Sequence, residues 1–323
     1  QVRGFMLLIG ADGGGTHTKL VLADESGCVL ASSEGGAVNY NAIGLTAARA
    51  NLFDAAESML VSVGQTLAHC DCFCIGSSAL DAPADAAQAA AFCGDRFDPD
   101  RCLMDSDAWV SLVAASEGRA GILMIAGTGA MGTASDGLGH RFTGGGWGYL
   151  LGDSGSGFDI GRRALLAAAE AEEGGPQTRL RARFLRRFGV DSIRSLIPLL
   201  YAPGFRPSDL AALAPEADAA ASEGDPVAQD ILRTAAASSA AVCAYLHAQT
   251  GAVDVFVYGG VFAHSARYLS EFRQALQNRG LAHLRISTPS LPPEAGALME
   301  AARFCGVLTP QFLSNLKKHF EKT

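Results

Sequence analysis

The sequence of 323 residues lacks several features that would assign it to a class at once. No apolar run reaches the roughly 18 residues that a membrane-spanning helix needs, so we expect no membrane partner. Basic residues are in deficit, with 25 Lys and Arg against 33 Asp and Glu. The resulting net charge of −8 offers no cationic surface for a phosphate backbone, so no nucleic-acid partner is expected. Disorder is excluded because 49% of the residues are hydrophobic.

The eight cysteines do not form the C-x2-C pairs of a zinc site. In the stretch HCDCFC, alternation places Cys70, Cys72 and Cys74 on one face of a strand, which favours core thiols over metal ligands. The N-terminal segment QVRGFMLLIGA has no A-x-A cleavage site, so a buried strand near Phe5 to Ile9 is expected rather than a signal peptide. Free thiols without a secretion signal predict a cytoplasmic location.

Two segments of the chain follow one plan. LLIGADGGGTHTKLVLADESGCVLASS is typical of a strand, a glycine turn, a strand, a D-x-x-G turn and a strand, and ILMIAGTGAMGTASDGLGHRFTG has the same pattern. The D-x-x-G turns fall at Asp24–Gly27 and Asp136–Gly139. The repeat predicts an internal duplication, with an N-terminal domain of residues 1–118 and a C-terminal domain of residues 119–323 whose last helix can pack back on the first.

Helical patterns alternate with further strands, which makes the protein α/β. CFCIGS, RCLMDS, VDVFVY and HLRIST are expected strands, and Ser106 or Asp107 is placed to cap a helix after the second of them. The other expected helices are Leu45–Ala68, Ala84–Phe92, Ile160–Glu173, Gln177–Phe188, Ser208–Ser222, Pro226–Gln249, Pro293–Phe304 and Pro310–Lys322.

The first glycine turn, GADGGGTHTKL, has neither the Rossmann spacing followed by a helix nor the Lys-Ser/Thr pair of a P-loop. The chain continues as a strand, which leaves a hairpin tip that can hold phosphate through backbone N–H groups and hydroxyls. Asp12 would repel that phosphate unless a cation lay between them, which predicts Mg2+ bound through water. An ordinary hairpin is the alternative. The phosphate ligands expected here are Gly13, Gly14, Gly15, Thr16 and Thr18.

The second glycine turn, Gly127 to Ala130, lies at the same point of the second repeat. Two phosphate-gripping hairpins facing each other across a cleft would explain the duplication, whereas two unrelated loops would leave it accidental. Taken together, the turns favour a nucleotide site over ordinary hairpins.

Four motifs now carry a family resemblance: GADGGGTHTKL, IAGTGA, GGGWGYLLGDSGSGFDIG and VYGGV, in this order over about residues 6–305. They resemble the N-acetylglucosamine kinase branch of the actin/Hsp70/sugar-kinase superfamily, which includes the BadF/BadG/BcrA/BcrD-type ATPases. The resemblance implies an ATP- and Mg2+-dependent kinase with duplicated ribonuclease-H-like (actin-like ATPase) domains around an interdomain cleft. It implies that Gly127, Thr128 and Gly129 form the second phosphate motif and that Gly259 and Gly260 form the adenosine motif.

Asp107 in MDSDAW matches the position of the catalytic carboxylate in kinases of this family. Phosphoryl transfer to a hydroxyl needs a carboxylate that orients the acceptor oxygen and takes its proton. Helix capping is the alternative role of Asp107. Asp105 lies two residues away and, if it points the same way, mutual repulsion would raise the pKa of one of the pair.

The amino-sugar site is implied by two further motifs. By resemblance, Gly146, Trp147 and Asp153 border the sugar, with Trp147 offering an apolar face to the ring and Asp153 accepting hydrogen bonds from hydroxyls. Core packing of Trp147 and a turn role for Asp153 are the alternatives. Asn39 in AVNYNAIG matches the asparagine that contacts the sugar, since an amide both donates to and accepts from hydroxyls. Asn41 competes for that role.

These features predict an amino-sugar kinase that phosphorylates a hydroxyl, expected to be O6, of N-acetylglucosamine. A glucosamine kinase and a non-catalytic amino-sugar sensor are alternatives, and a homodimer is left open. A further alternative is an activator-type ATPase whose iron–sulfur cluster would be held by Cys70, Cys72, Cys74 and Cys102. No C-x-C-G-x-x-G-C zinc motif of the repressor/glucokinase branch occurs in the chain.

Overall fold

The computed structural model describes residues 5–321, which divide into two compact units. Unit 1 contains the chain up to Arg119 and again from Pro289 onward, and unit 2 is Ala120–Thr288. The division near residue 119 lies where the repeat predicted it. The expected C-terminal domain was residues 119–323; in the structure, the segment from Pro289 onward groups with the first half of the chain.

Unit 1 is built on a five-stranded mixed sheet in the order β3-β2-β1-β4-β5. The first three strands form an antiparallel meander, and the last two add in parallel to β1. The parallel strands carry almost only buried residues, as expected for strands covered on both faces. The bounds are β1 Leu7–Gly13, β2 His17–Asp24, β3 Val29–Gly36, β4 Cys72–Ser77 and β5 Cys102–Ser106.

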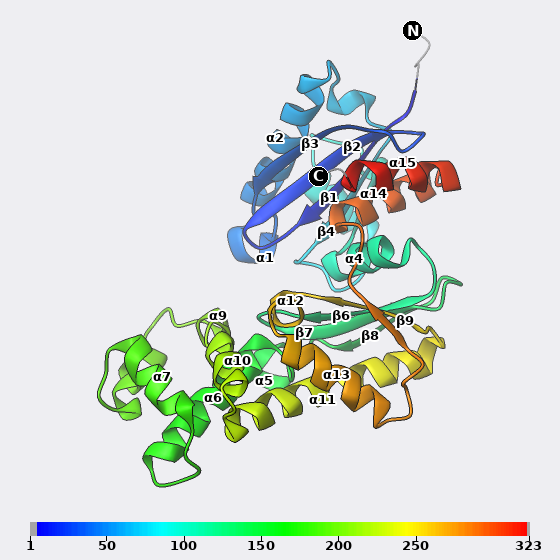
Figure 1. The fold of residues 1–323 in the computed structure, drawn as a ribbon. Coiled ribbons are helices and arrows are strands. Elements are labelled where there is room, and N and C mark those ends of the chain that lie inside the picture. The colour runs from blue at the N-terminus through cyan, green and yellow to red at the C-terminus, as the bar shows by residue number, and fades with distance from the viewer. Residues whose placement is uncertain (1–4, 322–323) are drawn as a thin grey trace. The chain divides into compact units, whose positions relative to one another are not determined.

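The helices of unit 1 lie close to the expected ranges, and α14 matches its prediction. They are α1 Tyr40–Ile43, α2 Leu45–Ser62, α3 Ala86–Cys93, α4 Asp107–Ser116, α14 Pro293–Phe304 and α15 Pro310–Phe320, with 3-10 turns at Leu67–His69 and Pro99–Arg101. Helix α2 ends six residues early because Gly64 takes a left-handed φ of 71°. Figure 1 shows α14 and α15 in orange and red beside the blue strands of this unit.

Helix α15 docks on the turn between β2 and β3; the sequence allowed the last helix to pack on the N-terminal domain but did not indicate where. The amide of Asn315 donates to the carbonyl oxygen of Ser26 at 2.9 Å. Gly27 has a φ of 81°, and a Cβ there would lie 2.4 Å from the carbonyl oxygen of Phe312. Lys317 pairs with Glu117 at 2.6 Å. The last helix is therefore part of unit 1.

Unit 2 repeats the sheet of unit 1. Its strand order, β10-β9-β6-β7-β8, has two antiparallel neighbours on one side of the first strand and two parallel neighbours on the other, as in unit 1. The predicted duplication is confirmed. The bounds are β6 Gly121–Ala126, β7 Ala130–Ser135, β8 Arg141–Gly145, β9 Asp254–Tyr258 and β10 Arg285–Ser287.

A long helical segment joins β8 to β9 in unit 2. The helices of the unit are α5 Gly148–Leu151, α6 Gly157–Glu172, α7 Arg179–Phe188, α8 Ile197–Leu200, α9 Pro207–Ala211, α10 Ala214–Ser222, α11 Pro226–Thr250, α12 Gly260–His264 and α13 Ala266–Gln277, with a 3-10 turn at Ile193–Leu196. The single helix expected over Ser208–Ser222 is divided into α9 and α10, because Pro215 cannot donate a backbone hydrogen bond. Across residues 5–321, no helix combines the length and hydropathy of a membrane span.

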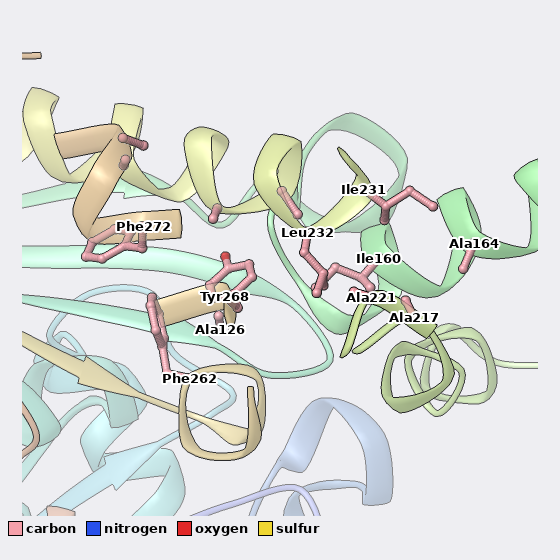
Figure 2. Packing of buried hydrophobic residues seen from close by; sticks show 14 of the residues in the cluster. Ala126, Ile160, Ala164, Ala217, Ala221, Ile231, Leu232, Phe262, Tyr268 and Phe272 are labelled. Carbon is pink, nitrogen blue, oxygen red and sulfur yellow. The ribbon is translucent and has the colours of Figure 1, made fainter. Parts of the chain in front are cut away.

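The core of unit 2 anchors the loop that precedes α6. Figure 2 shows Phe262, Tyr268 and Phe272 packed together, with ring centroids of Phe262 5.1 and 5.3 Å from those of the other two. The buried hydroxyl of Tyr268 donates to the carbonyl oxygen of Gly155 at 2.7 Å and lies 2.7 Å from the Ser239 hydroxyl. This hydrogen bond fixes the glycine-rich loop to packed side chains.

Candidate functional site

Three parallel strands of unit 1 end side by side. The register pairs Gly13 with Ser77 and Ser77 with Ser106, so β1, β4 and β5 present their carboxyl ends at one edge of the sheet. The glycine hairpin follows β1 at this edge, and Asp107 follows β5. In open α/β sheets, ligands bind outside the carboxyl ends of the strands. This edge is therefore the candidate site of unit 1.

The predicted hairpin is present at this edge. Gly13 pairs with Thr18 across the antiparallel strands, and the backbone N–H of Gly14 donates to the carbonyl oxygen of His17 at 3.0 Å. Gly13 is buried, and a Cβ there would come within 2.1 Å of Cγ2 of Val38. Packing alone therefore requires a glycine at this position, independently of any ligand.

Thr18 does not contribute its hydroxyl to the hairpin tip. Its side chain is 0% exposed, and the hydroxyl donates to the carbonyl oxygen of Gly36 at 2.7 Å. The expected phosphate contact through the Thr18 hydroxyl is therefore wrong, since the side chain is buried and its hydroxyl is bonded to the neighbouring strand. Gly15 and Thr16 are exposed at the tip and stay candidates, and a Cβ at Gly15 would meet nothing within 4 Å.

Asp12 precedes the hairpin and is a strongly perturbed acid. Its pKa is raised to about 7, chiefly by burial and then by the charges of Glu294 and Asp107, while Lys19 acts in the opposite direction. Carboxylate oxygens are the ligands that Mg2+ prefers, and a bound cation would favour the ionised form. Residues 5–321 contain no group of three or more His, Cys, Asp or Glu that could hold a metal ion. An ion at Asp12 would therefore keep most of its water shell.

Asp107 is the first residue of α4, but Ser106 performs the capping, because its hydroxyl accepts from the backbone N–H of Trp109 at 3.1 Å. Burial raises the pKa of the Asp107 carboxyl, and the nearby charge of Asp81 raises it further. The carboxylate of Asp105 accepts from the backbone N–H of Ser106 at 2.8 Å. The charge that raises the pKa of Asp107 beyond the effect of burial is that of Asp81, a residue that the sequence did not single out.

Asn39 lies at the same edge, but most of the hydrogen-bonding capacity of its side-chain amide is taken up by other groups of the protein. The amide nitrogen donates to the carbonyl and hydroxyl oxygens of Ser78 at 3.1 and 3.2 Å, and the amide oxygen accepts from the backbone N–H of Asn41. Ser78 in turn donates its backbone N–H to the carbonyl oxygen of Gly13 at 3.0 Å. The side chain of Asn41 donates to the carbonyl oxygen of Ala79. Both asparagines therefore support the loop after β4.

Unit 2 brings its glycine turn together with Asp153. A Cβ on Gly129 would lie 3.0 Å from Oδ2 of Asp153, whose Oδ1 accepts from the backbone N–H of Ala130 at 3.3 Å. Gly157 at the start of α6 donates its backbone N–H to the carbonyl oxygen of Gly127 at 2.8 Å. Burial raises the pKa of the Asp153 carboxyl. The carboxyl is thus part of the wall of the second glycine turn, between Gly127 and Ala130.

The Gly259–Gly260 pair lies beside this turn. The register pairs Ile125 with Tyr258, so β6 and β9 end together. Gly259 has a φ of 97°, and a Cβ there would lie 2.5 Å from the carbonyl oxygen of Ala126. Gly260 then begins α12. Both glycine motifs therefore occupy the carboxyl edge of the unit 2 sheet.

Trp147 is not a core residue, since 73% of it is exposed. Gly146 before it has a φ of 71° and donates its backbone N–H to the carbonyl oxygen of Ala130 at 3.1 Å, next to the second glycine turn. A cavity of about 1300 Å³ within unit 2 begins at Tyr149 and continues along Phe158 and Arg206. The loop that carries Trp147 thus borders both a glycine turn and an open cavity.

The cysteine cluster belongs to the core. Cys70, Cys72, Cys74 and Cys102 are all buried. Burial raises the pKa of the Cys70 and Cys72 thiols, which disfavours the thiolate that metal binding needs. The interpretation as core thiols is confirmed, and the geometry gives no support to a cluster site at these four residues.

Comparison with known sequences agrees with the motifs. A model of the BadF/BadG/BcrA/BcrD ATPase family matches residues 9–301. The chain is 29% identical over 303 residues to an N-acetylmuramic acid/N-acetylglucosamine kinase of Clostridium acetobutylicum, with 92% of this chain and 99% of that protein covered. It is 30% identical over 241 residues to an N-acetyl-D-glucosamine kinase of Dictyostelium discoideum, with 71% and 76% covered.

Comparison with solved structures gives the same result for the fold. A candidate N-acetylglucosamine kinase from Chromobacterium violaceum has a TM-score of 0.72 and 27% identity, with 92% of this chain and 99% of that chain covered. The sugar-kinase fold expected from the motifs is therefore confirmed, and so is the family resemblance, since the family model spans most of the sequence. The chain belongs to the BadF/BadG/BcrA/BcrD ATPase family.

Proposed function

We propose that the protein is an ATP-dependent amino-sugar kinase that transfers the γ-phosphoryl group to O6 of N-acetylglucosamine. Membership of an ATPase family supports ATP as the donor, and relatives named as N-acetylglucosamine kinases support the acceptor class. The observation that carries the proposal is the position of Asp107, a largely buried carboxyl with a raised pKa at the carboxyl edge of the unit 1 sheet.

Asp107 is assigned as the base. It would accept a hydrogen bond from the acceptor hydroxyl and take the proton as the bond from oxygen to phosphorus forms and the bond to the ADP oxygen breaks. Burial raises the pKa of Asp107, which brings the carboxylate closer to the basicity that a neutral-pH reaction needs. Asn39 is assigned to bind a sugar hydroxyl. Its amide oxygen accepts one hydrogen bond from the backbone N–H of Asn41 and has a second lone pair that can accept another.

The donor phosphates are assigned to the hairpin of unit 1. The exposed backbone of Gly15 and the hydroxyl of Thr16 would bind phosphate oxygens, and Gly14 would shape the turn through the hydrogen bond from its N–H to the carbonyl oxygen of His17. Asp12 would hold the water shell of Mg2+, and the ion, when bound, neutralises the charge of the phosphates. Gly13 has an indirect role, because the absence of a side chain lets the hairpin pack against Val38. Thr18 is part of the paired strands and is not assigned a phosphate contact.

The glycine turns of unit 2 are assigned by their positions on its sheet. Gly127, Thr128 and Gly129 would bind phosphate, and the Gly259–Gly260 pair would lie against adenosine. Trp147, exposed next to Gly146, would stack on the sugar ring, and Asp153 would accept hydrogen bonds from its hydroxyls. A cytoplasmic location and a homodimer stay predictions.

The decisive experiment replaces Asp107 by Asn, which keeps the shape and removes the proton acceptor. We expect kcat to fall by at least about a hundredfold in an assay of ADP release, with the KM for sugar changed little. Asp81→Asn is the matched control, because it removes a nearby charge and leaves the base in place. Its kcat should stay within a few-fold of wild type, and the acidic limb of its pH profile should move to lower pH.

The acceptor is tested with N-acetylglucosamine, glucosamine and N-acetylmuramic acid, and the position of the phosphate is read by phosphorus and proton NMR. Turnover with none of the three would contradict the proposed function. Near-normal turnover by Asp107→Asn would refute the assignment of the base, and a product phosphorylated at another hydroxyl would refute O6.

A further inference from the structure

Beside Asp12 lies a second acid that the roles above do not use. Glu294 is the second residue of α14, and only 8% of it is exposed. Its carboxylate atom Oε2 is buried and has no hydrogen-bond partner. A buried carboxylate oxygen without a donor is costly, so a native protein that keeps one has a reason to do so.

The packing of α14 places Glu294 above β1. A Cβ on Gly10 would lie 2.4 Å from the carbonyl oxygen of Glu294 and 2.3 Å from the backbone nitrogen of Leu298, so the helix lies directly on this residue. Side chains two positions apart on a strand share a face, so Asp12 projects on the same side as Gly10. Asp12 and Glu294 therefore occupy the same face, and the charge of Glu294 acts on the Asp12 carboxyl.

The charges around this pair are predominantly negative. Lys19 lies opposite Asp12 on β2, Glu34 lies opposite Lys19 on β3, and Asp107 acts on Asp12 from α4. Lys19 lowers the pKa of both Asp12 and Glu294, whereas Glu34 raises that of Glu294. Four carboxyl groups thus share one ammonium group, and the three that are largely buried, Asp12, Asp107 and Glu294, cannot rely on bulk water for solvation.

We propose that Glu294 is the second carboxylate of the magnesium site, holding with Asp12 the water shell of the ion; this rests on the proposed kinase function. Mg2+ keeps several waters and is bound in proteins through one or two carboxylates and the substrate phosphates. Contact through water agrees with residues 5–321 having no three-ligand cluster. The water shell would supply the donor that Oε2 of Glu294 lacks.

The test is the binding of Mn2+ to the protein in the presence of the non-hydrolysable analogue AMPPNP, followed by the EPR signal of free Mn2+. Glu294→Gln should weaken Mn2+ binding by tenfold or more, as loss of an outer-shell partner does. Glu34→Gln is the matched control, since it makes the same change at an exposed residue of the same surface, and it should change the affinity less than about twofold.

A purely structural role for Glu294 gives a different result. Glu294→Gln would then change the melting temperature of the metal-free protein but leave the Mn2+ affinity at the wild-type value, which overturns the proposal. If Glu294→Gln does not fold, Glu294→Asp keeps the charge on a shorter arm. Its melting temperature should then rise less on addition of Mg2+ and AMPPNP than that of wild type, and an equal rise also overturns the proposal.

Failure of the proposed function is separate, because Mn2+ binding needs no turnover. Wild-type protein that binds Mn2+ with AMPPNP through Glu294 but phosphorylates no amino sugar would refute the kinase assignment and leave the inference about Glu294 standing. Sugar phosphorylation by a protein whose Mn2+ affinity ignores Glu294 would refute only the inference.

Discussion

Asp12→Asn is expected to stabilise the metal-free protein at pH 8 while abolishing its activity. Burial is the largest cause that raises the pKa of Asp12 from 3.8 to about 7. The folded protein therefore binds this proton more tightly than the unfolded chain does. The resulting stabilisation is complete below about pH 4, and it is lost progressively as the pH rises through about 7.

The magnitude follows from the size of this change. A rise from 3.8 to about 7 corresponds to at most about 4 kcal/mol between the two protonation states, at about 1.4 kcal/mol per pH unit. Asn does not titrate. The free energy of unfolding of Asp12→Asn, minus that of wild type, should therefore increase by up to this amount as the pH rises from 4 to 7. Above pH 7.5 the difference should stay constant.

The assay is urea denaturation of both proteins at pH 4.5, 6, 7 and 8 with EDTA present. Taking the difference between the two proteins cancels groups that titrate alike in both, such as surface carboxylates. Addition of Mg2+ and AMPPNP at pH 8 should then stabilise wild type and leave the variant unchanged, because only wild type keeps the carboxylate at residue 12. A difference that does not vary with pH would refute the reasoning, since Asp12 would then titrate alike in the folded and unfolded states.

Two further predictions concern glycine and threonine. Gly296→Ala should lower the free energy of unfolding by about 2 kcal/mol, although alanine favours helices, because the new Cβ would lie 1.9 Å from the carbonyl oxygen of Val110. Gly260→Ala, with no contact closer than 3.8 Å, should be neutral in the same chemical denaturation, and equal effects would count against the close approach of α14 to α4. Thr18→Val should lower the free energy of unfolding by about 1 to 2 kcal/mol and leave the KM for ATP unchanged. Thr16→Val should leave the stability unchanged and increase the KM for ATP. An increased KM for Thr18→Val would restore that hydroxyl as a phosphate ligand.

Features set by local chemistry were predicted well. The glycine hairpin, the two D-x-x-G turns and the matching plan of both sheets follow from turn residues and from periodicity two. Helix α14 was predicted with its observed bounds because Pro293 begins it and its apolar residues keep helical spacing. The break between α9 and α10 was missed, although Pro215 signals it, because the alanines on both sides continue the helical pattern.

The orientation of Thr18 could have been read from the sequence. Thr18, Leu20 and Leu22 alternate along one strand, so the threonine shares the buried face of the leucines. Glu294 gave no such signal. Its position beside Asp12 depends on the approach of α14 to Gly10, which joins parts of the chain far apart in sequence. Long-range packing of this kind is set by the whole fold rather than by any local pattern.

The two repeats differ most in one connection. Between β3 and β4 the chain runs only from Gly36 to Cys72, whereas between β8 and β9 it runs from Gly145 to Asp254 and forms helices α5 to α11 (Figure 1). This longer connection begins and ends at fixed strand ends, so its sequence can change during evolution without disturbing the hydrogen bonds between the strands. Acceptor preference could therefore diversify among homologues while the paired strands, and the nucleotide chemistry assigned to their ends, stay the same.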